Sequence, residues 1–147
     1  MLQLRPATTA DYAYAKHVKH TAYKDMVMAQ FGAWDETVQD RFFDKSWNGG
    51  RYDIILMDGE PCGFCRIDEH DTILQLVEFA IEVPKQNRGI GSMVLSRFME
   101  IAKAKGKVAQ MNVMKTNTRA RALYERLDFA VYGENEFQYR MRSMRVR

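Results

Sequence analysis

The spacing of apolar side chains changes along the chain, and these changes divide its first third into three elements. Residues 2–5 alternate between apolar and polar, which predicts a strand that Pro6 ends. A helix is expected from about residue 8 to Gly32, because apolar residues then recur at spacings of three and four. A shorter helix follows from about residue 35 to 48. The apolar residues of the two helices are Ala15, Val18, Ala22, Met26 and Ala29, then Val38, Phe42 and Phe43.

From residue 52 onward, short runs with a period of two alternate with helical runs. Strands are predicted at 52–57, 62–67, 72–83, 107–114, 129–132 and 137–141, and helices at 92–105 and 117–127. Strands outnumber helices, and the two kinds alternate in the second half. This pattern indicates the α/β class, with a mixed sheet covered by helices. At 147 residues, the chain fits a single domain, 1–147.

Charge and hydropathy exclude several classes of function. The formal net charge of +3 is too small for a chain that coats nucleic acid, so we expect no nucleic-acid partner. Four arginines between 140 and 147 are interpreted as an exposed last strand with a basic tail. Apolar runs are short and the N-terminus lacks the order of a secretory signal, so we expect a cytoplasmic protein without a membrane partner.

The segment Gln86-Asn-Arg-Gly-Ile-Gly91 joins a predicted strand to a predicted helix. Glycines at 89 and 91 remove side chains that would keep a ligand away, so several main-chain N–H groups can converge on one anion. The unpaired N–H groups and the dipole at the start of the following helix point at the same place. The loop therefore predicts a phosphate site, although an ordinary strand-to-helix turn would have the same form.

Two common phosphate motifs do not match this loop. A nucleotide P-loop requires a lysine followed by serine or threonine after the last glycine, whereas Gly91 is followed by Ser92 and Met93. A dinucleotide fingerprint requires a third glycine where the chain has Val94. The loop must therefore serve a different phosphate compound.

A second segment, Asn117-Thr-Arg-Ala-Arg-Ala-Leu-Tyr-Glu-Arg-Leu-Asp-Phe129, follows the next predicted strand. With the glycine loop, it resembles the GCN5-related N-acetyltransferase (GNAT) family, which carries Gln/Arg-x-x-Gly-x-Gly/Ala after its fourth strand and Asn…Ala-x-x-Leu-Tyr-Glu…Gly-Phe after its fifth. The resemblance covers essentially the whole chain. It departs at Asp128, where the family usually has glycine; aspartate tolerates left-handed backbone angles better than most residues.

The resemblance implies the GNAT fold, a mixed and mostly antiparallel sheet of about six or seven strands that splays between strands 4 and 5, with about four helices. It also implies acetyl-CoA as the acetyl donor. The loop would hold the diphosphate, strand 4 would pair with the pantetheine arm and donate an N–H to the thioester carbonyl, and Asn117 would brace the arm or its own helix. The residues assigned to the donor are Ile81, Val83, Gln86, Arg88, Gly89, Ile90, Gly91, Ser92, Asn117 and Tyr124.

Direct attack by a substrate amine requires two proton transfers. Tyr124 matches the family's tyrosine, and its phenol can protonate the departing thiolate, unless it only packs on the sheet. Glu78 and Glu82 lie in an otherwise apolar run, and a period of two places them on one face. One of them, directly or through water, is the candidate base; a salt bridge to a covering helix is the structural alternative. Many relatives use an acid on the fifth strand, where this chain has Asn112.

The acceptor is expected to be a primary amine of a small molecule or peptide, bound near the first two helices. Phe31, Trp34, Asp35 and Glu36 combine aromatic rings with two acids that can hold a cation. Asp35 can equally cap the second helix. His17 and His20 lie three residues apart without a third ligand nearby, so we expect no metal.

Two other functions compete with acetyl transfer. Cys62-Gly-Phe-Cys65 has the spacing of a redox pair, but it starts a strand, so its side chains are expected on opposite faces and no redox role is assigned. A non-catalytic module that binds an acyl-CoA would carry the same donor residues. A homodimer is also compatible with the sequence.

Overall fold

The computed structural model describes residues 1–143, so Arg145 and Arg147 of the predicted basic tail lie outside the described residues. The strands are β1 (Leu2–Pro6), β2 (Tyr52–Met57), β3 (Glu60–Glu69), β4 (Ile73–Ile81), β5 (Val108–Met114), β6 (Phe129–Glu134) and β7 (Gln138–Ser143). The helices are α1 (Tyr12–Phe31), α2 (Glu36–Gly49), α3 (Ile90–Ala104) and α4 (Thr118–Arg126), with short 3-10 turns at Thr9–Asp11 and Val83–Lys85. None of the helices in this described part of the chain combines the length and the apolar character that a membrane-spanning helix needs.

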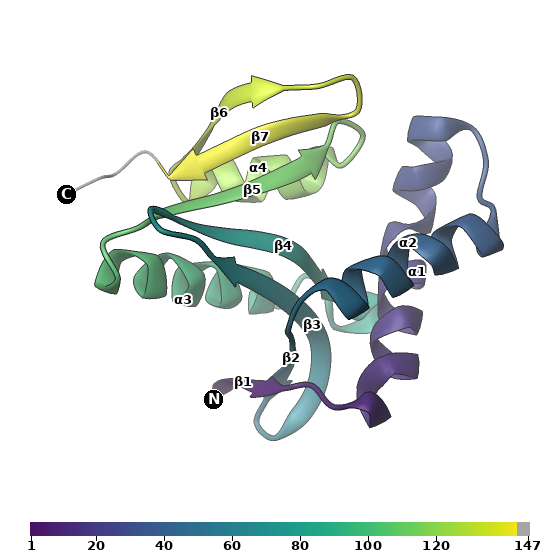
Figure 1. Cartoon of the computed structure of the whole chain (residues 1–147), viewed down its shortest axis with the longest axis horizontal. Coiled ribbons are helices and arrows are strands. Elements are labelled where there is room, and N and C mark those ends of the chain that lie inside the picture. The colour runs from purple at the N-terminus through teal and green to yellow at the C-terminus, as the bar shows by residue number, and fades with distance from the viewer. Residues whose placement is uncertain (144–147) are drawn as a thin grey trace.

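All seven strands form one sheet in the order β1-β2-β3-β4-β5-β7-β6 (Figure 1). Every neighbouring pair is antiparallel except β4 and β5, which run parallel. The predicted mixed sheet is thus confirmed. The expectation of an exposed last strand holds for Arg140 and Arg142, which are exposed, but not for the strand as a whole, because β7 inserts between β5 and β6 and buries Met141 completely.

The two faces of the sheet are covered by different helices. Helices α1 and α2 enclose a small aromatic core over β2 to β4, which includes Phe43 and Phe64. Helices α3 and α4 enclose the larger core on the other face, which includes Phe98 and Met111. Two predicted core positions are wrong. Ala29 on α1 and Phe42 on α2 are exposed. In the last turns of α1 the buried residue is Val27, because α1 touches the sheet along only part of the predicted stripe.

The parallel pairing of β4 and β5 covers only four residues, from Ile73 opposite Val108 to Leu76 opposite Met111. Beyond this point both strands continue without pairing to each other. We call these diverging segments the splay. Strand β4 ends at Ile81, earlier than expected, because the chain turns into the 3-10 segment that contains Pro84.

Gly63 permits the close approach of β3 and β4 beside the splay. A Cβ at this position would lie 2.2 Å from the Ala80 carbonyl oxygen, so Gly63→Ala must push the two strands apart. We expect the free energy of unfolding to fall by at least about 2 kcal/mol in urea titrations. Gly91→Ala is the matched control, because its Cβ would make only ordinary contacts, 3.5 Å or longer. A Gly63→Ala protein as stable as the unmodified one would contradict this packing.

Candidate active site

Main-chain groups of β4 face the splay at alternate residues. The Glu82 N–H donates to the Cys62 carbonyl on β3 (2.8 Å), whereas the Phe79 carbonyl turns away from β3 and accepts from the Tyr23 hydroxyl (2.8 Å). Since N–H and C=O groups alternate in direction along a strand, those of Phe79 and Ile81 face the splay. Strand β5 no longer pairs with β4 there, so the N–H groups of both residues are available to a ligand.

Gln86 fixes the end of β4. Its side-chain amide donates to the Ile81 carbonyl (3.0 Å), which leaves the Ile81 N–H as the group directed at the splay. The prediction that Val83 extends the strand is wrong, because Val83 opens a 3-10 turn and its carbonyl accepts from the Gln86 N–H (3.2 Å). Sequence reasoning missed Phe79, whose main chain occupies the corresponding place two residues before Ile81.

The glycine loop presents a row of unpaired N–H groups. Gly89 caps α3 with a left-handed φ of 80°, which glycine adopts without strain. A Cβ at Gly89 would meet no atom within 4 Å, so its surroundings are open. Among residues 1–143, no acceptor takes a hydrogen bond from the N–H groups of Arg88, Gly89, Ile90, Gly91 or Ser92. With the dipole of α3, these donors form an anion site.

Arg119 joins the two motif segments, a role that the sequence did not reveal. Its guanidinium donates to the Gln86 side-chain oxygen (3.2 Å) and to the Asn87 side-chain oxygen. Asn117 caps α4 by accepting from the Ala120 N–H (3.1 Å), which supports the second of its two predicted roles. Asp128 has a φ of 67°, the left-handed conformation expected at this departure from the motif.

Tyr124 reaches the splay from the α4 side. Its ring is buried and lies 6.3 Å from that of Phe129, and burial raises the pKa of its hydroxyl to about 12. Tyr23 approaches from α1 on the opposite face. Burial raises the pKa of Tyr23 well above its usual value, with a further increase from the neighbouring Tyr124 and then Glu78. Tyr23, which donates to Phe79 beside the splay, and Tyr124, from the opposite helical layer, are therefore close enough for one hydroxyl to influence the other.

Glu78 lies in a polar network between β4 and α1. Its carboxylate pairs with Lys19, accepts from the Tyr52 hydroxyl, and lies 3.3 Å from the Ser46 hydroxyl. The Lys19 pair is the salt bridge to a covering helix that the sequence left open. Burial and then Glu78 raise the pKa of Tyr52, so this phenol stays a donor to the carboxylate.

Glu82 belongs to a second network beyond the end of β4. It accepts from the Tyr14 hydroxyl of α1, and its carboxylate lies 3.4 Å from Lys85 Nζ. Both glutamates thus face α1, as the period of two predicted, although they have different partners. Asn112 on β5 is exposed and supplies no acid.

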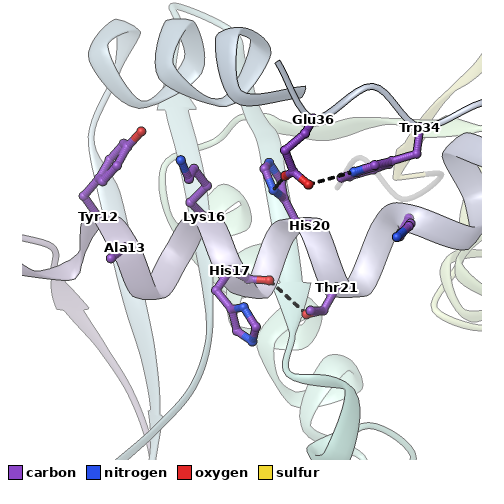
Figure 2. Close-up of a pocket in the computed structure, with 9 residues that line it drawn as sticks. Tyr12, Ala13, Lys16, His17, His20, Thr21, Trp34 and Glu36 are labelled. Atoms are coloured by element: carbon purple, nitrogen blue, oxygen red, sulfur yellow. Dashed lines mark hydrogen bonds and ion pairs between the residues drawn. The ribbon is translucent and has the colours of Figure 1, made fainter. Parts of the chain in front are cut away.

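Of the four residues predicted for the acceptor, Trp34 and Glu36 lie together, whereas Phe31 and Asp35 have other partners. Asp35 caps α2 by accepting from the Val38 N–H (3.2 Å), and Phe31 packs against Phe137 with ring centroids 4.8 Å apart. Trp34 Nε1 donates to Glu36 (3.2 Å), and both line a hollow of about 420 Å³ along α1 (Figure 2). The lining of this hollow includes none of Tyr23, Glu78 and Tyr124.

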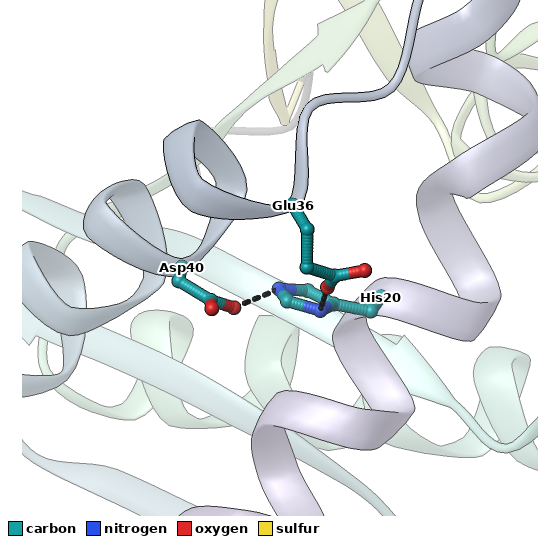
Figure 3. Close-up of side chains that lie close together, drawn as sticks. All are labelled: His20, Glu36 and Asp40. Carbon is teal, nitrogen blue, oxygen red and sulfur yellow. Dashed lines mark ion pairs between the residues drawn. The ribbon is translucent and has the colours of Figure 1, made fainter.

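His20 lies between two acids rather than beside His17. Its Nδ1 is 2.9 Å from Glu36 and its Nε2 is 3.6 Å from Asp40, so both ring nitrogens face carboxylates from α2 (Figure 3). The three side chains offer ligand atoms within 4.8 Å of one another, a grouping that the sequence did not reveal because the acids are distant along the chain. Lys16 Nζ lies 3.4 Å from Asp40 and already balances part of this negative charge.

The two cysteines are buried together. Both belong to the core under α3 and α4, so the prediction that they face opposite sides is wrong. A register shift between Ile55 and Leu56 places Cys62 at a bulge, which breaks the period of two. Burial raises the pKa of both thiols, that of Cys65 to about 12, which disfavours a reactive thiolate.

Comparisons with known proteins agree with this architecture. The model of the family described as "Acetyltransferase (GNAT) family" matches residues 19–129. A 5-NmdU N-acetyltransferase of Pseudomonas phage PaMx11 is 31% identical over 94 residues, 63% of this chain and 66% of the relative. The match thus spans slightly less than two thirds of the relative's length.

Solved structures share the fold at low sequence identity. The PaiA N-acetyltransferase from Thermoplasma acidophilum, in complex with coenzyme A, superposes with a TM-score of 0.73 at 15% identity, covering 97% of this chain and 98% of that one. The ribosomal-protein-S18-alanine N-acetyltransferase from Escherichia coli gives 0.69 at 18% identity, covering 97% and 93%. With the family match over most of its length, the chain belongs to the GNAT family of acetyltransferases.

Proposed function

We propose that the protein transfers the acetyl group of acetyl-CoA to a primary amine of a small molecule or peptide by direct attack. The observation that carries this proposal is the splay, where β4 presents unpaired main-chain donors, together with an anion site at the start of α3. The phage relative's name, which specifies N-acetyl transfer, supports the same class of reaction.

The residues present fit acetyl-CoA. The unpaired N–H groups of residues 88–92 suit its diphosphate, and the open surroundings of Gly89 leave room for it. The N–H groups of Phe79 and Ile81 suit the amides and the thioester carbonyl of the arm. When bound, acetyl-CoA supplies an activated acetyl group as a thioester. The N–H of Phe79 is our candidate for stabilising negative charge on the carbonyl oxygen.

Tyr124 is our candidate acid. A phenol with a pKa near 12 keeps its proton at neutral pH, so its oxygen holds a proton for a departing thiolate. Glu78 and Glu82 remain the candidate bases, directly or through water. Glu78 is the better placed of the two. Its charge contributes to the raised pKa of Tyr23, whose hydroxyl donates to the Phe79 carbonyl beside the splay.

A module that binds an acyl-CoA without turnover is the alternative. It would need the same loop and the same main-chain donors, so donor binding does not separate the two functions. The buried Tyr124 beside the splay favours catalysis, because binding alone does not require a proton donor there. Turnover with a panel of primary amines, followed by release of free thiol, discriminates between them.

Tyr124→Phe tests the acid. We expect kcat to fall by roughly 100-fold, the usual contribution of a positioned acid, with the Kd for coenzyme A changed less than twofold. In the unmodified protein, a pKa near 12 predicts no loss of rate from this group below about pH 10, because the phenol remains protonated there. Equal losses in kcat and in coenzyme A binding would reject the acid role.

Arg88→Glu tests the anion site. Arg88 is exposed beside the unpaired N–H groups, so reversing its charge opposes a diphosphate. We expect the Kd for coenzyme A to rise about tenfold in calorimetric titrations, equivalent to about 1.4 kcal/mol. Arg41→Glu on α2, also exposed but in the other helical layer, is the matched control and keeps the original Kd. An unchanged Kd for coenzyme A in the Arg88→Glu protein would show that the loop is not part of the donor site.

A further inference from the structure

Two main-chain carbonyl groups of β4 face the splay, and a side chain pairs with each of them. The Phe79 carbonyl accepts from the Tyr23 hydroxyl of α1 (2.8 Å), and the Ile81 carbonyl accepts from the side-chain amide of Gln86 (3.0 Å). Among residues 1–143, the N–H groups of Phe79 and Ile81 have no acceptor. The edge of β4 at the splay therefore offers hydrogen-bond donors, while its acceptors are already occupied.

The occupied carbonyl of Phe79 matters because an extended residue directs its N–H and its carbonyl to the same side of the strand. A ligand oxygen that accepts from the Phe79 N–H consequently lies close to the Phe79 carbonyl oxygen. Both oxygens carry partial negative charge and repel each other, and the repulsion grows as negative charge develops on the ligand. The Tyr23 hydroxyl places the positive end of its O–H bond on the Phe79 carbonyl, which reduces this repulsion.

The surroundings of Tyr23 keep its hydroxyl protonated. Burial raises the pKa of Tyr23 well above its usual value, and the neighbouring Tyr124 and Glu78 raise it further. The Nζ of Lys19, which pairs with Glu78, lies over the Tyr23 ring, 4.6 Å from the centroid. Tyr23 is therefore a lasting donor to the Phe79 carbonyl at neutral pH and does not serve as a base.

Tyr23 and Tyr124 differ in what their hydroxyl protons do. The Tyr124 hydroxyl makes no hydrogen bond to residues 1–143, and burial alone raises its pKa. The proton of Tyr23 is engaged with the Phe79 carbonyl, so Tyr23 could give it to a departing thiolate only by breaking that bond. The candidate acid thus stays Tyr124, and Tyr23 is available for a different role.

We propose that Tyr23 is a positioning residue for acetyl transfer: it occupies the Phe79 carbonyl, so that the thioester oxygen meets the Phe79 N–H without an opposing main-chain oxygen. This inference rests on the proposed function and adds to it a residue of the first helical layer. Tyr23 acts through the main chain of Phe79 rather than on the thioester itself. Its partner lies 56 residues away along the chain, so no local pattern in the sequence indicates the role.

The test follows the carbonyl carbon of acetyl-CoA, labelled with carbon-13, by NMR with the protein in excess and no amine present. A polarised carbonyl resonates downfield, so we expect a downfield shift on binding to the unmodified protein. In Tyr23→Phe the signal moves back toward its position in free acetyl-CoA, while the Kd for coenzyme A, which lacks this carbonyl, changes by less than about twofold. Tyr12→Phe is the matched control and keeps the full shift, because this hydroxyl of α1 donates to Asp44 instead.

A second variant strengthens the donor instead of removing it. A difluorotyrosine incorporated at position 23 has a more acidic phenol, which donates a stronger hydrogen bond to the Phe79 carbonyl. We expect the carbonyl signal of bound acetyl-CoA to move further downfield than in the unmodified protein. A purely structural role for Tyr23 predicts no such graded response.

An unchanged carbonyl shift in both Tyr23 variants, or an equal loss of the shift in Tyr12→Phe, would overturn the inference and leave the acetyltransferase proposal standing. Failure of acetyl-CoA to bind the unmodified protein would instead reject the proposed donor site, and the role of Tyr23 with it. A bound carbonyl that resonates at its free position in the unmodified protein would likewise reject the Phe79 N–H as a donor to the thioester.

Discussion

The structure depends on the early end of hydrogen bonding between β4 and β5. Parallel pairing stops after four residues, and the main-chain groups of β4 beyond it lose their partner strand. Buried main-chain groups left unpaired cost free energy, so the protein satisfies some of them from elsewhere. Tyr23 donates to the Phe79 carbonyl and Gln86 donates to the Ile81 carbonyl. What remains at the edge of β4 is a set of N–H donors, which gives the splay its preference for carbonyl oxygens.

The splay is also where side chains from the two helical layers approach each other. Elsewhere the sheet separates the aromatic core under α1 and α2 from the larger core under α3 and α4. At the splay, Tyr23 from α1 and Tyr124 from α4 are close enough for one phenol to affect the pKa of the other. Helix α1 extends past this point and contacts the loop after β5, where Thr116 donates to the Met26 carbonyl (3.0 Å). The same helix therefore contacts both β4, through Tyr23, and the loop after β5, through Met26.

Local signals in the sequence predicted most of the fold. Alternation, helical periodicity and the two motifs gave the strands, the four helices, the glycine loop and the helix that carries Tyr124. Errors arose where local periodicity was broken: a bulge turned Cys62 to the same side as Cys65, and the turn at Pro84 removed Val83 from β4. Most specific long-range contacts could not be predicted. Arg119 contacts residues more than thirty positions away, and β7 inserts between β5 and β6, out of chain order.

The most direct test of the account is a crystal structure of the protein with coenzyme A. We predict that the diphosphate accepts hydrogen bonds from the N–H groups of residues 88–92, and that the thiol lies between the Phe79 main chain and the Tyr124 hydroxyl. Coenzyme A bound elsewhere, or β4 and β5 paired along their whole length with the thiol outside, would contradict it.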